Sequence, residues 1–283
     1  MEAAELATAP RTRVAMVVAP YAFVLAPAAD LRAVPGADAE LVDQLHYREM
    51  ARVLASREGW HYVQAEDHYF GWIRDDAVQV MPGSEGGRVV GVPLAPIYWE
   101  RDTSSEVVGV LPAGTSLPVR EFPPVEGPWV SAHVRTRGGR EHPSGPSGYV
   151  SLDDATELAD LPHRPPTADD LLATAEAFLG VPYLWGGTTA LGMDCSGYVQ
   201  QVYRLNGIRL DRDADQQAME GRPVDEAIAG DLLFFGAERI THVAISTGGE
   251  GYLHAPQSGA LIQRGTLAAR APRLARRYLA DPS

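Results

Sequence analysis

The sequence has little cysteine: Cys195 is the only one among 283 residues. A single cysteine excludes an intramolecular disulfide, and the chain therefore shows no sign of an oxidising compartment. A lone cysteine is more often an inert core residue than a nucleophile. The residues around Cys195 in the sequence have to indicate whether it is a core residue or a nucleophile.

The sequence also lacks long apolar runs and an excess of positive charge. No apolar stretch reaches the ~20 residues of a membrane helix, and a formal net charge of -13 disfavours a nucleic-acid partner. Residues 14–29 resemble a secretory signal, but the leader is acidic and two prolines interrupt the run. We predict a cytoplasmic monomer, with export to the cell envelope as the alternative.

Long helical repeats are missing from the first half of the chain, which alternates apolar and polar residues between turn signals. This pattern predicts two sets of short strands. The first set is residues 50–53, 60–63 and 71–73, and the second is 89–92, 107–111, 117–120, 129–134 and 148–150. Gly59-Trp60 and Pro128-Trp129 recur in the two sets, which indicates two related β modules in tandem.

The sequence character changes after the prolines of residues 162–166. Thr167, followed three residues later by Asp170, predicts a capped helix start, and apolar residues at helical spacing continue to Leu179. A second helix should begin near Asp194. Strand-like runs follow at residues 231–235, 242–246 and 251–255. Helices followed by an antiparallel sheet predict an α+β domain.

Cys195 opens the second predicted helix, directly after Asp194. Unpaired backbone N–H groups and the helix dipole favour an anion at this place, which lowers the pKa of a thiol. The Asp194 carboxylate acts in the opposite direction, because a negative neighbour disfavours the thiolate. Asp194 therefore predicts a cation that arrives with the substrate, or a plain helix N-cap, and both can hold.

Two histidines are placed to serve Cys195 as a base and the partner of that base. His242 begins one predicted strand, and His254 lies on the next, twelve residues later across Gly248-Gly249. Antiparallel pairing of these strands brings the imidazoles together, so a Cys–His–His triad is geometrically available. Taken alone, each of the three residues is more often structural, and the same side chains could instead ligate zinc.

Six segments, in order, closely resemble the NlpC/P60 peptidases: residues 181–187, 194–199, 213–217, 230–235, 242–245 and 254–255. The resemblance extends from Asp169 to the C-terminus. It implies a papain-like core that needs no metal or other cofactor, with a catalytic triad of Cys195, His242 and His254. It also places the hydroxyl of Tyr183 in the active site.

The N-terminal modules are similar to bacterial SH3 domains. The resemblance thus implies two SH3-like β-barrels, at residues 12–82 and 83–160, before an α+β papain-like domain at 161–283. This arrangement resembles the γ-D-glutamyl-L-diamino-acid endopeptidases, which process murein peptides. In those enzymes the first SH3 module helps to hold the free amino terminus of the substrate. The residues that this implies as substrate contacts are Asp194, Ser196, Asp213, Glu49 and Tyr69.

The implied function is that of a cysteine peptidase acting on murein peptides, at the bond between γ-D-glutamate and diaminopimelate or lysine. Two alternatives stay open: an acyltransferase on the same fold, and a non-catalytic protein that binds the cell wall. Two positions depart from the family pattern, Ala214 where some relatives have serine and Asp211 where proline is common. The first removes one possible hydroxyl contact, and the second alters the loop.

Overall fold

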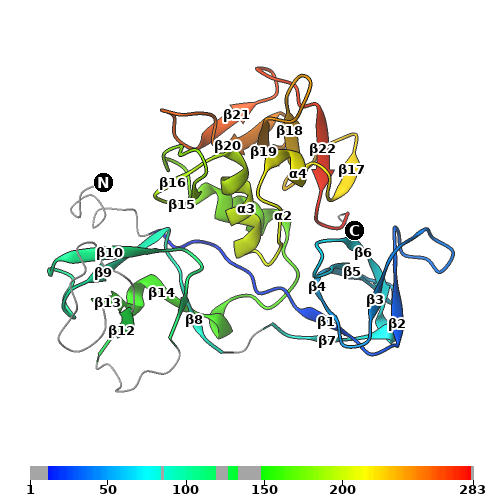
Figure 1. Ribbon diagram of the computed structural model, residues 1–283, viewed down its shortest axis with the longest axis horizontal. Coiled ribbons are helices and arrows are strands. Elements are labelled where there is room, and N and C mark those ends of the chain that lie inside the picture. The colour runs from blue at the N-terminus through cyan, green and yellow to red at the C-terminus, as the bar shows by residue number, and fades with distance from the viewer. Residues whose placement is uncertain (1–11, 84–85, 119–126, 133–147, 282–283) are drawn as a thin grey trace. The chain divides into compact units, whose positions relative to one another are not determined.

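The computed structural model describes residues 12–83, 86–118, 127–132 and 148–281 (Figure 1). The chain divides into two compact units. One unit comprises residues 1–15, 84–161 and 189–191, and the other comprises residues 16–83, 162–188 and 192–283. None of the helices in the described ranges has the length and hydrophobicity of a membrane span.

The first β module is an antiparallel sheet of seven strands in the order β3-β2-β6-β5-β4-β1-β7. The strands are β1 (Tyr21–Val24), β2 (Ala28–Arg32), β3 (Leu41–His46), β4 (Met50–Arg57), β5 (Trp60–Gln64), β6 (Phe70–Arg74) and β7 (Val78–Met81). Every strand contributes a side chain to one buried apolar cluster, so the sheet curls around a single core. The three predicted strands of this module are confirmed as parts of β4, β5 and β6.

The second β module has two smaller sheets, in the orders β10-β9-β13-β12 and β11-β8-β14. Its strands are β8 (Arg88–Val90), β9 (Leu94–Tyr98), β10 (Val107–Pro112), β11 (Ser116–Leu117), β12 (Trp129–Ala132), β13 (Gly148–Ser151) and β14 (Ala155–Glu157). The predicted strands are present, although parts of 117–120 and 129–134 lie outside the described residues. Because the sheets of the two modules differ, the predicted tandem of SH3-like barrels stays a prediction.

The C-terminal domain places its helices before its main sheet, as predicted for an α+β domain. The helices are α2 (Ala168–Glu176), α3 (Cys195–Leu205) and α4 (Ala214–Gln217), with a short hairpin of β15 (Thr188–Thr189) and β16 (Gly192–Met193) before α3. Six strands follow in the order β17-β22-β18-β19-β20-β21. They are β17 (Arg222–Val224), β18 (Leu232–Phe235), β19 (His242–Gly248), β20 (Gly251–His254), β21 (Gln263–Thr266) and β22 (Leu274–Arg277).

The start of α2 has the predicted capping box. The backbone N–H of Asp170 donates to Thr167 Oγ1 over 3.3 Å, and the backbone N–H of Thr167 donates to Asp170 Oδ2 over 2.8 Å. The predicted end of this helix at Leu179 is wrong, because α2 ends at Glu176. The chain then turns towards Gly180, whose φ of +87° favours glycine.

Strand β19 is buried on both faces. The alternation of side chains along it fixes the face that its first residue, His242, occupies. Ala244 belongs to an apolar cluster on one face, and by alternation Val243 and Ile245 point to the other face. By alternation, His242 shares the face of Ala244. Helix α3 contacts β19 in this domain.

Candidate active site

The Cys195 thiol lies where α3 and β19 both begin. The backbone N–H of Val243 donates towards Cys195 Sγ, so the sulfur lies at the peptide that joins His242 to Val243. The side chain of Cys195 is only partly exposed, and His242 is buried. The predicted nucleophile and the predicted base are therefore neighbours.

Two glycines allow the chain to close tightly around the start of α3. The carbonyl of Gly187 accepts the backbone N–H of Asp194 over 3.2 Å. A Cβ atom added to Gly197 would lie 2.1 Å from that carbonyl oxygen, a distance that no side chain permits. The close approach explains on physical grounds why glycine occupies position 197.

Asp194 is the N-cap of α3, and its carboxylate accepts five hydrogen bonds, one of them from the Ser196 hydroxyl over 3.3 Å. Its carboxylate accepts the backbone N–H groups of Gly197 over 2.7 Å and Gly186 over 2.8 Å. Arg212 donates to both oxygens, over 3.1 and 2.6 Å, and also donates to Ser196 Oγ over 2.8 Å. This chain itself therefore provides the cation that the sequence argument expected from the substrate. Arg212 was not among the predicted site residues, although it stands between Asp211 and the predicted site residue Asp213.

The prediction of an acidified thiol is wrong for the resting protein. Burial raises the pKa of the Cys195 thiol, and the charge of Asp194 raises it further. The N–H groups of Val243, Ser196 and Cys195 itself lower that pKa, but the net shift is upward. The sulfur is consequently held as a neutral thiol.

The predicted approach of the two imidazoles is confirmed. His242 Nε2 and His254 Nδ1 are 2.9 Å apart, and the rings meet edge to face with centroids 5.1 Å apart. Burial, His254 and Arg270 lower the pKa of His242 to about 4. Burial and then Arg270 also lower the pKa of His254. Both rings are therefore neutral near neutral pH, which is the state that a general base requires.

Tyr183 lies beside the nucleophile, as the resemblance implied. Burial raises the pKa of its hydroxyl, and the Cys195 thiolate, whenever it forms, and the Asp194 carboxylate raise it further, so the hydroxyl stays a hydrogen-bond donor. Trp185, two residues further along the chain, is 84% exposed.

The predicted ammonium-binding residues fall into separate places. Asp213 is exposed and caps α4, where its backbone N–H and the Gln216 side chain complete a capping box. Glu49 has His46 as its partner, with 3.0 Å between the carboxylate and His46 Nδ1. The structure thus joins Asp194 and Ser196 to the cysteine, and it gives Glu49 a partner within its own β module. Their binding roles stay predictions.

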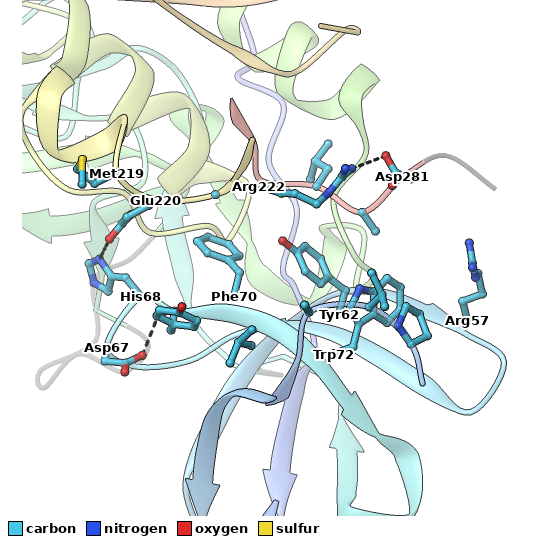
Figure 2. Close-up of a pocket in the computed structure, with 18 residues that line it drawn as sticks. Arg57, Tyr62, Asp67, His68, Phe70, Trp72, Met219, Glu220, Arg222 and Asp281 are labelled. Atoms are coloured by element: carbon cyan, nitrogen blue, oxygen red, sulfur yellow. Dashed lines mark hydrogen bonds and ion pairs between the residues drawn. The ribbon is translucent and has the colours of Figure 1, made fainter. Parts of the chain in front are cut away.

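Tyr69 lines a separate pocket of about 620 Å³, which the first β module shares with the C-terminal domain (Figure 2). The residues labelled in Figure 2 include the aromatic side chains Tyr62, Phe70 and Trp72 and the ion pair of Arg222 with Asp281. Of the predicted site residues, Tyr69 alone lines this pocket.

One side of this pocket carries His68 and Glu220 together with Asp211. Among the described residues, these three form the one group of His, Cys, Asp or Glu side chains with metal-ligand atoms within 4.8 Å of one another. Burial, followed by the charges of Asp211 and Asp67, raises the pKa of Glu220 to about 7. The zinc site of Cys195, His242 and His254 stays an untested alternative, and in the structure the two imidazoles approach each other over 2.9 Å.

Comparison with known families gives two matches, one in each half of the chain. Residues 180–273 match the NlpC/P60 family, and residues 31–78 match the bacterial dipeptidyl-peptidase Sh3 domain. The gamma-D-glutamyl-L-lysine dipeptidyl-peptidase of Bacillus subtilis (strain 168) is 45% identical over 125 residues, which make up 42% of this chain and 41% of that protein. Dipeptidyl-peptidase 6 of Lysinibacillus sphaericus is 30% identical over 255 residues, or 84% of this chain and 88% of that protein.

The fold is similar to the crystal structure of an NlpC/P60 family protein from Bacillus cereus, with a TM-score of 0.53 and coverage of 92% of this chain and 100% of that one. At 22% identity this likeness shows the fold alone. The matched stretch spans 41% of the Bacillus subtilis relative, so the activity of that protein is not transferred with the match. The Lysinibacillus relative is matched along nearly its whole length, and the C-terminal domain matches the family directly. The chain belongs to the NlpC/P60 family.

Proposed function

We propose that this chain is a cysteine peptidase that hydrolyses the bond between γ-D-glutamate and a diamino acid in murein peptides that begin with a free L-alanine. The observation that carries the proposal is the meeting of the Cys195 thiol with the start of β19, where His242 pairs with His254 over 2.9 Å. Acyl transfer requires a thiol nucleophile, a neutral imidazole that accepts its proton, and a second imidazole that orients the first.

The neutral resting state sets the order of the proton transfers. His242 takes the proton of Cys195 as the sulfur attacks the γ-carbonyl carbon, which gives a tetrahedral oxyanion. His242 then gives this proton to the leaving amine, the C–N bond breaks, and a thioester remains. Water, deprotonated by His242, cleaves the thioester and restores the thiol.

The residues around the triad have supporting roles in this proposal. With Nδ1 of His242 as the base, its Nε2–H donates to His254 Nδ1, which fixes the orientation of the ring and stabilises its charged form. The backbone N–H groups of Cys195 and Ser196 point at the sulfur, and the hydroxyl of Tyr183 lies beside them. These donors would hold the oxyanion.

The substrate class rests on the relatives. The two matched proteins above are named as dipeptidyl-peptidases, one of them specific in its name for the γ-D-glutamyl-L-lysine bond. The exposed carboxylate of Asp213 next to the Arg212–Asp194 pair gives a substrate ammonium one acceptor near the nucleophile. The cytoplasmic location and the monomeric state stay predictions.

The test is cleavage of L-Ala-γ-D-Glu-diaminopimelate followed by mass spectrometry. We expect L-Ala-γ-D-Glu and free diaminopimelate from the wild type and no product from Cys195→Ala. A substrate with an acetylated amino terminus should be cleaved at least roughly tenfold more slowly, because it has no ammonium to pair. Binding without any cleavage by the wild type would favour a non-catalytic wall-binding protein. Equal rates on both substrates would remove the ammonium contact.

A further inference from the structure

Arg270 lies near His242, the proposed general base, and has no role in the proposed chemistry. It follows β21, its side chain is exposed, and its guanidinium carbon lies 5.1 Å from the centroid of the Phe235 ring. Phe235 pairs with His242 in the register of β18 and β19, and the two rings are 5.7 Å apart. The positive charge of Arg270 therefore stands next to the predicted base, at the His242 end of the sheet.

The neighbouring arginines have protein partners, whereas Arg270 presents its guanidinium to solvent. Arg264 pairs with Glu176 over 2.6 Å, and Arg273 donates to the carbonyls of Ala237 and Glu238. In the described part of the chain, no hydrogen bond or ion pair is formed by the Arg270 side chain, which contacts the face of Phe235. A guanidinium that is oriented by an aromatic ring and still has its donors available fits a carboxylate on a ligand.

The position of Arg270 indicates which part of the substrate it meets. If the proposed function holds, His242 protonates the leaving amine. The leaving diamino acid therefore lies against the imidazole. The guanidinium lies over the ring of Phe235, which in turn neighbours the imidazole, so we expect a group that reaches it to extend past the scissile amine. Lysine and diaminopimelate differ at this far end of the side chain, where diaminopimelate alone carries a carboxylate.

We propose that Arg270 is a specificity-determining residue that binds the side-chain carboxylate of the leaving diamino acid, so that this chain cleaves before diaminopimelate in preference to lysine. The inference rests on the proposed function for the direction in which the leaving group lies. It goes beyond that function because it selects between its two substrates. The α-carboxylate is shared by both substrates and therefore cannot distinguish between them.

The experiment compares two tripeptides, L-Ala-γ-D-Glu-diaminopimelate and L-Ala-γ-D-Glu-L-Lys, in the wild type, in Arg270→Gln and in the control Arg264→Gln. At about pH 8 the imidazole of His242 is neutral in each protein, so the proton equilibria do not differ. We expect the wild type and the control to prefer diaminopimelate by about tenfold in kcat/KM. Arg270→Gln should lose this preference, through a drop on diaminopimelate, while kcat/KM on the lysine peptide stays within about twofold.

Two outcomes would overturn the inference: a preference that persists in Arg270→Gln, or an equal drop on both peptides, which would make Arg270 a general electrostatic or structural residue. Calorimetric binding of the two peptides to Cys195→Ala, with and without Arg270→Gln, keeps the test independent of turnover. If the wild type cleaves neither peptide, the proposed function fails. The ratio of the dissociation constants then still decides whether Arg270 reads the carboxylate.

Discussion

The two ends of the active site are built in opposite ways. At the nucleophile end, the Asp194 carboxylate is surrounded by two backbone N–H groups and the guanidinium of Arg212. At the base end, His242 has another imidazole as its partner, and no carboxylate is among the groups that shift its pKa. The charge of Asp194 is thus balanced by other groups of the protein, whereas His242 and its partner are uncharged.

This difference explains why Cys195 and His242 are both neutral before a substrate binds. Burial raises the pKa of Cys195 and lowers that of His242, so each environment favours the neutral form. A thiolate beside an imidazolium is therefore not the resting state, and charge separation has to accompany attack on a bound carbonyl. The ionic network of Asp194 then serves mainly to hold the helix start, and not to supply a charge for catalysis.

Removal of the base should have the largest effect. We expect His242→Gln to lower kcat/KM on the diaminopimelate peptide by about a thousandfold or more, because the neutral thiol then has no proton acceptor. His61→Gln is the matched control, since His61 lies on β5 and pairs with Ser56 over 2.8 Å. A loss of less than about tenfold in His242→Gln would mean that the thiol ionises without this imidazole.

Removal of the cation at the nucleophile end should mainly affect stability. Arg212→Met leaves the buried Asp194 carboxylate without its guanidinium, and we expect a loss of about 3 kcal/mol in the free energy of unfolding. The double variant Asp194→Asn with Arg212→Met should recover about half of that loss, because no charge is then stranded.

Urea denaturation measures this cycle, with Arg222→Met as the control. Arg222 pairs with Asp281 on the surface, and we expect a loss of less than about 1 kcal/mol there. If Arg212→Met is as mild as Arg222→Met, Asp194 does not depend on the guanidinium, and the contrast between the two ends of the site disappears.

Crowding of the helix start should have a smaller effect. Gly197→Ala places a methyl group against the carbonyl of Gly187, and we expect a loss of about 2 kcal/mol in the free energy of unfolding. Gly36→Ala is the control, because its nearest neighbour is Ala39 Cβ at an ordinary 3.8 Å. Chemical denaturation of the two variants side by side gives the comparison, and equal stability would show that the loop at Gly187 yields freely.

The sequence was informative where local chemistry sets the structure. The capping box at Thr167, the start of α3 at Cys195 and the hairpin that joins His242 to His254 each depend on residues close in the chain, and each is confirmed. Burial is a property of the folded domain, so the raised thiol pKa could not be read from a helix start alone. Arg212 and Arg270 were missed for the same reason, because their meaning depends on the groups that the fold places beside them.

The pH dependence of activity should show the smallest and most specific effect. The folded pKa of His242, about 4, lies below its ordinary value of 6.5, so the unfolded chain binds a proton that the folded chain excludes between these pH values. The stability that this group contributes is therefore present above pH 6.5 and is lost as the pH falls to about 4. Activity should follow the same titration, with the acid limb of kcat/KM near pH 4 and not near 6.5.

Arg270→Gln sharpens this prediction, because it removes one of the charges that lower the pKa of His242. The acid limb should move up by roughly half a pH unit, as expected for one charge near a partly solvated site. The lysine peptide is the right substrate here, since it has no side-chain carboxylate whose binding could change with Arg270. An acid limb of the wild type at or above pH 6.5 would mean that His242 takes up a proton as readily as an ordinary histidine, and the base end of the site would then not favour the neutral imidazole.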